Sequence, residues 1–326
     1  MKPLNITNTF VQSFLVCLLT LTGQSIQAQD QYPNKPISLI VPYGPGGSTD
    51  QLARALGEGM SKQLKQPVII EFKPGAGGTL GAAQMARTKP DGYSLTMLPI
   101  SVFRQPYLQT VTYDPLKDLS YIATVSNYTY AIAVMAEAKW KTINELVEDA
   151  KANPGKFSYS GSAQYSSNHL SMVEIGRIAG IEWTFIPYKG DAEGLTALFG
   201  GHVQVVASTS TVLPFVKSGK VRVLATVGDK RPADFQDAPT LQEAGYPVVM
   251  HSPLGIAGPA GLPSSIIEKL DKAIATTLQD PKFKESMAAL GIELSYRDHK
   301  EYAAYAVKTF AQEKTIIERL AKETQK

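Results

Sequence analysis

The segment SLIVPYGPGGSTDQLARALGEGMSKQ, residues Ser38–Gln63, joins an apolar run to a glycine-rich turn and the start of a helical pattern. The apolar run Leu39–Val41 stops at Pro42, three glycines follow, and Ser48–Asp50 open the helical pattern. Such a strand–loop–helix junction presents free backbone N–H groups and the positive end of a helix dipole, which together suit an anion. The segment therefore predicts an anion-binding turn at the end of a strand.

The same pattern recurs in the next part of the chain. The apolar run VIIEF, Val68–Phe72, is followed by the glycine-rich turn Pro74–Gly78 and then by the helical pattern TLGAAQMART. Neither turn has a nucleotide-binding signature, because Gly47 is followed by Ser48 rather than by the lysine of a Walker loop, and the second turn lacks the dinucleotide spacing. Two such turns at consecutive strand ends predict a small acidic ligand, with simple tight turns as the alternative.

The charge of the two turns favours a carboxylate over a phosphate. Phosphate sites usually contain arginine or lysine, whereas Lys73 is the one cation beside these turns. Backbone N–H and hydroxyl donors suffice for a carboxylate, because each hydrogen bond to a charged group contributes about 1.5–3 kcal/mol. Micromolar affinity requires about 8 kcal/mol, so roughly four or five such bonds would hold the ligand.

Composition and charge restrict the class of protein. The chain has 326 residues, of which 44% are hydrophobic and 19% charged, which is ordinary for a globular protein of about two domains. The net charge is +3 and the basic residues are scattered, so we expect no nucleic-acid partner. The four histidines show no metal spacing and no Gly-x-Ser-x-Gly motif occurs. We therefore expect no enzyme activity, no catalytic residue, no metal and no cofactor.

The N-terminus has the pattern of an export signal. Lys2 precedes the apolar segment Phe10–Leu21, and SIQA at Ser25–Ala28 resembles a cleavage site. This predicts a signal peptide at residues 1–28 and a location in the periplasm; because the apolar segment is short and interrupted, an uncleaved membrane anchor is the less favoured alternative. Cys17 is the one cysteine, so the mature chain would have no disulfide, no thiol nucleophile and no cysteine metal site.

Beyond residue 30, short apolar runs alternate with amphipathic segments, which indicates an α/β fold. The expected strands are Ile37–Val41, Val68–Phe72, Ser94–Leu98, Ile122–Val125, Ala131–Met135, Phe157–Ser160, Thr184–Tyr188, Val203–Ser208, Val221–Val227, His251–Ala257 and Ile292–Tyr296. The expected helices are Thr49–Gln63, Thr79–Thr88, Ile143–Lys151, Asn168–Ala179, Ala192–Phe199, Val212–Ser218, Leu241–Ala244, Ser264–Leu278, Pro281–Leu290 and Tyr302–Lys322. Because ligands bind at the carboxyl ends of parallel strands, five loops of the two halves are expected to face one cleft.

One of these loops, SGSAQYSSNH at Ser160–His169, is dense in small polar side chains. Five of them are candidates for a second carboxylate or a carbonyl: Ser162, Gln164, Ser166, Ser167 and Asn168. Helix capping is the alternative role for the last two. Asp50 and Asp191, the acids nearest the loops, either accept a hydroxyl or amine of the ligand or order their own loops.

With these features the chain resembles the Bug-type, TctC-like periplasmic receptors of tripartite tricarboxylate transporters. The resemblance covers the whole mature chain. Its strongest marks are YPNKPISLIVPYGPGGSTDQLAR (Tyr32–Arg54) and PGAGGTLGAAQMARTKPDGYSL (Pro74–Leu95). Further marks are PYKGDAEGLTALFGGHVQVV (Pro187–Val206), GKVRVLATVGDKRPADFQDAPTLQEAGYP (Gly219–Pro247) and GPAGLP (Gly258–Pro263).

The resemblance implies a type II periplasmic binding protein, a Venus flytrap in which two α/β domains are joined by two crossover strands. Domain 1 would combine residues 29–127 and 228–326, and domain 2 would contain residues 128–227, with the ligand cleft between them. We place the crossovers near Ile122–Val134 and Val221–Val227.

The resemblance also implies how the ligand is held and where it goes. The two glycine turns would grip one carboxylate, largely through backbone N–H groups and bridging waters, and the loop Ser160–Asn168 with Ser208 would complete the site from domain 2. The protein would act as a monomer and deliver its ligand to the integral-membrane permease subunits of the transporter. A ligand-sensing co-receptor for a two-component sensor kinase is the alternative, and an exported enzyme is a third.

Two segments depart from the family pattern. Val206–Ser210 reads VASTS where the family often has an acidic or amide residue, and LPISVFRQPY places Ser101 and Arg104 near the cleft. Arg104 would pair with a ligand carboxylate, or else be solvated. We infer a ligand without an ammonium group, either a di- or tricarboxylate or an aromatic carboxylate packed against Tyr43.

The residues expected to bind the ligand come from six loops or strand ends. They are Tyr43, Gly46, Gly47, Ser48, Thr49, Asp50, Ala76, Gly77, Gly78, Ser101, Arg104, Ser162, Gln164, Ser167, Asn168, Lys189, Asp191, Ser208 and Thr209.

Overall fold

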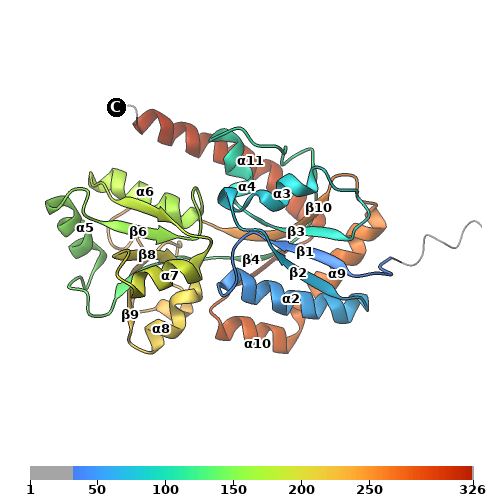
Figure 1. The fold of residues 1–326 in the computed structure, drawn as a ribbon, viewed down its shortest axis with the longest axis horizontal. Coiled ribbons are helices and arrows are strands. Elements are labelled where there is room, and N and C mark those ends of the chain that lie inside the picture. The colour runs from blue at the N-terminus through green and yellow to red at the C-terminus, as the bar shows by residue number, and fades with distance from the viewer. Residues whose placement is uncertain (1–31, 325–326) are drawn as a thin grey trace, which may run out of the picture. The chain divides into compact units, whose positions relative to one another are not determined.

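Two β-sheets organise the protein, of which the computed structural model describes residues 32–324. The predicted signal peptide, residues 1–28, lies outside the described residues. The first sheet has the strand order β11-β4-β10-β3-β1-β2 and the second the order β7-β6-β8-β5-β9 (Figure 1). Each sheet with the helices packed on it is called a lobe here.

The first sheet contains β1 (Ile37–Val41), β2 (Val68–Phe72), β3 (Ser94–Pro99), β4 (Leu119–Asn127), β10 (Pro253–Pro259) and β11 (Leu294–Arg297). β1 is parallel to both β2 and β3, whereas β10 runs antiparallel to β3 and β4. β1 and β3 are almost fully buried, which explains their continuous apolar runs. The chain therefore returns late in the sequence to complete its first sheet.

The second sheet contains β5 (Ala131–Met135), β6 (Ser158–Gly161), β7 (Thr184–Pro187), β8 (Val205–Ser208) and β9 (Val221–Thr226). β6 is parallel to β7 and β8, and β5 runs antiparallel to β8 and β9. The chain passes from the first sheet to the second between β4 and β5 and returns between β9 and β10. These two passages agree with the expected crossovers, while the exact domain boundaries stay a prediction.

The helices are α2 (Ser48–Leu64), α3 (Leu80–Met85), α4 (Ser101–Arg104), α5 (Ile143–Ala152), α6 (Ser167–Ala179), α7 (Asp191–Phe199), α8 (Leu213–Lys217), α9 (Ser264–Gln279), α10 (Pro281–Ala289) and α11 (His299–Thr324). Short 3₁₀ turns are η1 (Ala76–Gly78), η2 (Gln105–Tyr107), η3 (Ser210–Val212) and η4 (Ala233–Phe235). α2 packs on β1 and β2, and α9 and α11 pack on β4. None of the helices within residues 32–324 is long and apolar enough to cross a membrane.

Local chemistry sets several helix ends. Thr142 caps α5 by accepting a hydrogen bond from the Glu145 N–H at 3.2 Å, and Asp280 caps α10 by accepting one from the Phe283 N–H at 2.9 Å. α2 starts directly after Gly47, which is extended, so the first glycine turn feeds straight into a helix N-terminus. This is the junction that the sequence predicts.

Three expected strands, Ile37–Val41, Val68–Phe72 and Ala131–Met135, are found unchanged, and most other expected elements are found with bounds shifted by a few residues. The expected helix Leu241–Ala244 is wrong. That segment makes a single turn, in which the Ala244 N–H donates to the Thr240 carbonyl, and Gly245 at a φ of +95° ends it. Leu241 alone of this segment is buried, so the segment has no apolar face that would favour a longer helix.

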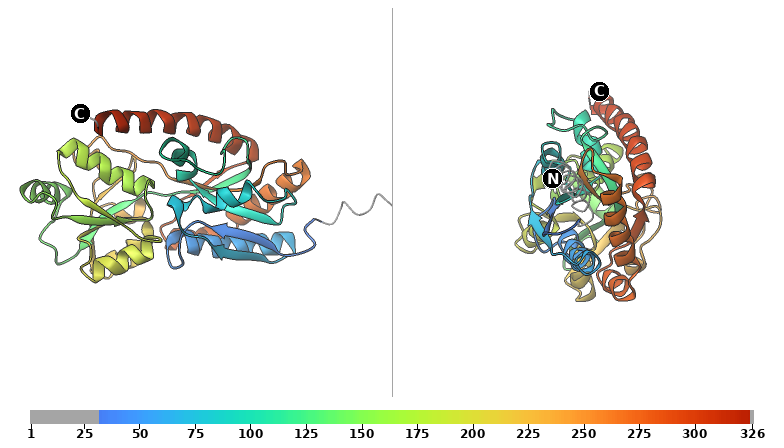
Figure 2. Two further views of the ribbon diagram at one scale, coloured as in Figure 1. Left: turned by 45° about the horizontal axis from the view of Figure 1, so that its top comes forward. Right: turned by 90° about the vertical axis from the view of Figure 1, so that its right-hand side faces the viewer.

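α11 is the longest helix and connects the two lobes (Figure 2). It packs on β4 and α4 of the first lobe, and near its end Arg319 forms an ion pair with Glu174 of α6, which belongs to the second lobe. The C-terminal helix is therefore anchored on one lobe and attached by a side chain to the other.

Candidate functional site

Two cavities lie where the lobes meet. The larger, of about 250 Å³, is lined by the second glycine turn, by Gln105 and Gln109, and by the loops 162–165 and 187–189. The smaller, of about 10 Å³, has room for roughly one water molecule. Tyr43 and Ser162 line both cavities, so the two are neighbours in one interlobe site.

The first glycine turn is bonded to the second lobe. The Gly44 N–H donates to the Lys189 carbonyl at 2.8 Å, and the Ser48 N–H donates to the Thr211 Oγ1 at 3.1 Å. The Gly46 N–H donates to the Asp50 carboxylate at 2.8 Å. Three backbone N–H groups that the sequence analysis assigned to a ligand therefore donate to groups of the protein. Two of these bonds cross between the lobes, so the lobes are closed on each other at this edge.

A cluster of hydroxyl groups surrounds the N-terminus of α2. The Ser48 Oγ lies 2.9 Å from the Thr209 Oγ1, 3.2 Å from the Ser210 Oγ and 2.9 Å from the Thr211 Oγ1. Thr49 is buried beside this cluster and lines the smaller cavity. The cluster joins the lobes through neutral groups, so it accommodates either donors or acceptors.

The carboxylates of Asp50 and Asp191 bond to groups of the protein, and neither residue lines the larger cavity. Asp191 accepts hydrogen bonds from the Ser162 hydroxyl at 2.5 Å and from the Thr209 N–H and hydroxyl at 2.9 and 2.5 Å. Asp50 accepts from the Gly46 N–H and from the Arg54 Nε, the latter at 2.6 Å. Asp50 thus orders its own turn, as one of its two expected roles, whereas Asp191 orders two neighbouring loops of the second lobe.

The second glycine turn forms part of the wall of the larger cavity. Gly75, Ala76, Gly77 and Gly78 all have positive φ angles, and the Ser101 hydroxyl donates to the Gly77 carbonyl at 2.7 Å. A Cβ atom on Gly77 would lie 2.2 Å from the Gln105 Nε2 and 3.0 Å from the Gln164 carbonyl. Any side chain at position 77 would therefore clash, so glycine is the residue that lets the two lobes approach this closely here.

Gln105 is a site residue that the sequence analysis missed. It lines the larger cavity, is only 1% exposed, and its Oε1 has no hydrogen-bond partner within residues 32–324. A buried amide without a partner is costly, so its presence beside a cavity indicates a role there. The sequence did offer one signal for Gln105, because it directly follows Arg104 in the segment LPISVFRQPY, which departs from the family pattern. Gln109, Tyr128, Tyr130, Tyr165 and Tyr188 also line the cavities and were missed.

Arg104 does not line either cavity. Its guanidinium donates to the Glu313 carboxylate at 2.6 and 3.0 Å and to the Tyr165 carbonyl at 2.7 Å. Both members of the ion pair are buried, with side-chain exposures of 2% and 4%. The structure thus gives Arg104 partners within the protein in place of the expected ligand carboxylate or solvent.

Three further predicted residues, Ser167, Asn168 and Ser208, are buried outside the cavity walls. The Asn168 amide donates to the Ser162 hydroxyl at 2.9 Å and to the Ala207 carbonyl at 2.5 Å, and the Ser167 hydroxyl donates to the His251 carbonyl at 3.2 Å. The Ser208 Oγ has no partner within the described chain. Ser167 and Asn168 therefore support the loops that carry the site.

Burial favours the neutral forms of His169 and Tyr43. Burial, together with the charge of Arg104, lowers the pKa of His169 from 6.5 to about 4, and the His169 Nδ1 accepts the Tyr165 N–H at 3.1 Å. Burial raises the pKa of Tyr43 well above its usual value of 10.0. Lys189 is the one charged residue among the described residues that line the larger cavity. That cavity consequently has neutral donors and one cation at its edge.

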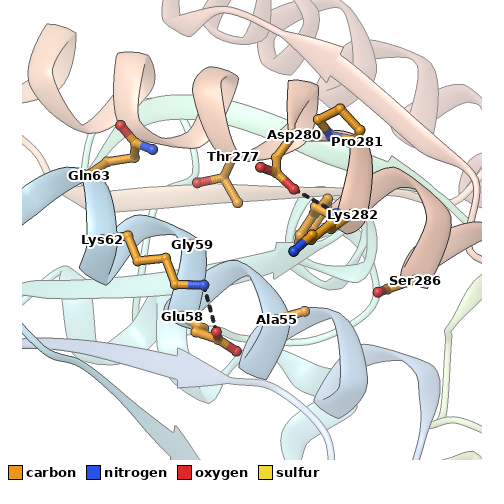
Figure 3. Close-up of a pocket in the computed structure, with 11 residues that line it drawn as sticks. Ala55, Glu58, Gly59, Lys62, Gln63, Thr277, Asp280, Pro281, Lys282 and Ser286 are labelled. Atoms are coloured by element: carbon orange, nitrogen blue, oxygen red, sulfur yellow. Dashed lines mark hydrogen bonds and ion pairs between the residues drawn. The ribbon is translucent and has the colours of Figure 1, made fainter.

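A further hollow, of about 600 Å³, lies elsewhere, between α2 and the α9–α10 turn (Figure 3). Its wall includes Glu58 and Lys62, which pair at 2.7 Å and have side chains about 70% exposed. Such hydrated charges form an open surface groove, and no predicted site residue lies there. Among the residues that the structure describes, no cluster of three or more His, Cys, Asp or Glu side chains could hold a metal ion.

Comparisons with known proteins bear on the family and the fold of the chain. Residues 52–322 match the model of the tripartite tricarboxylate transporter family receptor. A Cupriavidus necator protein described as "UPF0065 protein in gbd 5'region" is 43% identical over 303 residues, which cover 93% of each chain. The structure of the periplasmic binding protein BugD is 31% identical, with a TM-score of 0.85 over 89% of this chain and 99% of that one. The R. palustris protein Rpa4515, solved with adipate, is 26% identical, with a TM-score of 0.83 over 90% and 98% of the two chains.

Proposed function

Because the chain belongs to the tripartite tricarboxylate transporter receptor family, we propose that it captures a small organic carboxylate between its lobes. The observation that carries the proposal is the charge of the larger cavity. Lys189 is the one charged residue among its described lining residues, and the remaining polar groups there are neutral. A lining without an acid disfavours an ammonium group and accepts a singly charged carboxylate.

Neutral groups around the larger cavity supply enough hydrogen bonds for useful affinity. Gln105, Gln109 and Gln164 line it together with the second glycine turn, whereas the Ser162 hydroxyl, also in the lining, is already donated to Asp191. At about 1.5–3 kcal/mol for each bond to a charged group, roughly four or five bonds reach micromolar affinity. Gln105 would donate to the carboxylate through its Nε2, whereas its buried Oε1, which has no partner within the described chain, would accept a hydroxyl of the ligand.

Two classes of carboxylate suit the site. The relative Rpa4515 was solved with adipate, which supports a linear dicarboxylate. Tyr43, Tyr165 and Tyr188 line the larger cavity, which supports an aromatic carboxylate packed on their rings. Comparing the two classes directly is therefore part of the test.

Ligand capture would proceed by hinge closure. The hydrogen bond from Gly44 to Lys189 and the Ser48 hydroxyl cluster join the lobes in the closed form and would break on opening. The passages at residues 128–130 and 227–252 would act as hinges, with residues 29–127 and 228–326 moving as one domain and 128–227 as the other. Closure would remove the carboxylate from water and strengthen each of its hydrogen bonds.

The protein would work outside the cytoplasmic membrane. Residues 1–28 would direct export to the periplasm, where the monomeric, ligand-loaded receptor would dock on the permease subunits of a tripartite transporter. Family membership supports this pathway. It predicts that deleting the receptor abolishes uptake of its ligand in cells that keep the permease.

Thermal unfolding with a panel of ligands tests the capture step. We expect adipate, citrate or benzoate to raise the Tm, because a ligand that binds only the native state at about 100 times its Kd contributes about 2.7 kcal/mol. Adipamide and 1,6-diaminohexane, which match adipate in length without its negative charges, are the controls. The proposal fails if no carboxylate stabilises the protein, or if the neutral and cationic controls stabilise it equally.

A further inference from the structure

Arg104 has a hydrogen-bond partner in each lobe. Its Nε and Nη2 donate to the two carboxylate oxygens of Glu313 at 2.6 and 3.0 Å, and its Nη1 donates to the Tyr165 carbonyl at 2.7 Å. Arg104 and Glu313 lie on α4 and α11 of the first lobe, whereas Tyr165 precedes α6 in the second. The guanidinium therefore spans the interface while its charge is balanced within the first lobe.

Tyr165 is held at both ends of its backbone. Its N–H donates to the His169 Nδ1 at 3.1 Å, and its carbonyl accepts from Arg104. Its φ of +62° is rare for a residue with a side chain and persists only where the surroundings hold it. Because Tyr165 also lines the larger cavity, the contact with Arg104 fixes part of the cavity wall.

We propose that Arg104 is a positioning residue for ligand binding, oriented by Glu313 so that it fixes Tyr165 against the ligand when the lobes close. The inference rests on the proposed function, since the Arg104–Tyr165 contact forms and breaks only in a protein that closes and opens. In the open form Arg104 keeps Glu313 and loses the Tyr165 carbonyl. The closed form therefore gains a charge-assisted hydrogen bond, and α11 contributes to affinity without touching the ligand.

The chemistry of arginine suits this role. The guanidinium is planar, and its fork of donors serves Glu313 on one edge while a third N–H points to Tyr165. A lysine provides a point charge and cannot hold both partners in fixed directions. Removing the Glu313 charge would leave the buried guanidinium of Arg104 without a counter-charge. The guanidinium would then lose the partner that fixes its orientation.

A second contact between α11 and the other lobe provides a matched control. The Arg319 Nη2 donates to the Glu174 Oε1 at 2.6 Å, and the Arg319 side chain is 47% exposed. Neither residue is among those that line the two interlobe cavities. Because the Arg319 side chain is half exposed and Glu174 keeps its ion pair with Arg177 at 2.9 Å, loss of the Arg319 contact should change closure little and leave Tyr165 in place.

The test measures closure and affinity separately. Spin labels at Lys117→Cys in the first lobe and Lys156→Cys in the second, in a Cys17→Ser background, report the interlobe distance by pulsed electron resonance. Calorimetry with adipate and with benzoate reports affinity. We expect Arg104→Lys and Glu313→Gln to lower the ratio of closed to open molecules at least fivefold and to weaken probe binding at least tenfold. Arg319→Gln should leave both within about twofold of the wild type.

Two more variants separate positioning from folding. Tyr165→Gly keeps the carbonyl that Arg104 needs and removes the ring, so it should close normally and bind the probe weakly. The double variant Arg104→Gln/Glu313→Gln leaves no unbalanced buried charge, so it should fold and still show the closure defect.

The proposal is overturned if Arg104→Lys and the double variant lower only the Tm, with interlobe distances and probe affinity as in the wild type. It is also overturned if Arg319→Gln shows the same closure defect. If neither probe binds the wild type at all, the proposed carboxylate capture fails, whereas the distance distributions still decide whether Arg104 controls closure.

Discussion

The hydroxyl of Ser162 donates a 2.5 Å hydrogen bond to the carboxylate of Asp191, which joins the loop after β6 to the first residue of α7. The same carboxylate accepts two bonds from Thr209 at the end of β8. One buried acid therefore holds together three loops of the second lobe, and two of its partners line the smaller cavity.

We expect Asp191→Ala to destabilise the protein. It removes the acceptor of three hydrogen bonds and leaves buried donors on Ser162 and Thr209, a loss of about 3 kcal/mol at roughly 1 kcal/mol for each bond. Urea denaturation gives the free energy of unfolding. Asp191→Asn, which keeps the shape and one acceptor oxygen, should show a smaller loss. Equal stability of Asp191→Ala and the wild type would contradict the ordering role.

The two glycine turns should respond differently to alanine. In Gly77→Ala the new Cβ meets the Gln105 amide at 2.2 Å and the residue keeps a φ of +66°, so we expect at least a tenfold loss of affinity for a carboxylate probe. In Gly47→Ala the nearest atoms lie 4.0 Å away, which is ordinary contact, so affinity should stay within about threefold. Calorimetry on both variants decides, and equal affinities would show that close approach at Gly77 is not required.

Gln105→Met should weaken ligand binding without lowering the free energy of unfolding. Methionine has nearly the same shape, removes the buried Oε1 that has no partner within the described chain, and also removes the Nε2 donor that a carboxylate would use. We therefore expect an unfolding free energy equal to the wild type or about 1 kcal/mol higher, and probe binding about tenfold weaker. Gln63→Met, in the exposed groove of Figure 3, is the control and should change neither value. Unchanged affinity in Gln105→Met would remove Gln105 from the ligand site.

Stability should fall in acid because His169 resists protonation. Its pKa of about 4 in the folded protein lies below the ordinary 6.5, so the unfolded chain binds more protons between these values. The stabilisation is therefore complete above pH 6.5 and is lost as the pH falls towards 4, about 3 kcal/mol in total.

Chemical denaturation of the wild type and His169→Gln between pH 4 and 8 isolates this contribution from that of the carboxylates. The difference in unfolding free energy between the two proteins should shrink as the pH falls. A difference that stays constant across this range would mean that His169 is not held neutral.

Local patterns in the chain were enough to predict most of the fold. The apolar run of β1, the glycine turn and the start of α2 follow from neighbouring residues, because strand burial, turn geometry and helix initiation act over a few positions. Tyr43, Gly77, Gln164 and Lys189 were likewise expected at the ligand from their loops, and all four line the larger cavity.

The sequence alone determined an α/β chain with two glycine turns at strand ends, and it predicted an acidic ligand. Tertiary structure decided which polar groups remain for that ligand. Glu313 takes up the charge of Arg104 from 209 positions away, and Asp191 is saturated by Ser162 and Thr209, while the Gln105 amide is left facing the cavity. Hydrogen-bond partners far apart in the chain carry no local pattern, because they depend on how whole sheets and helices pack.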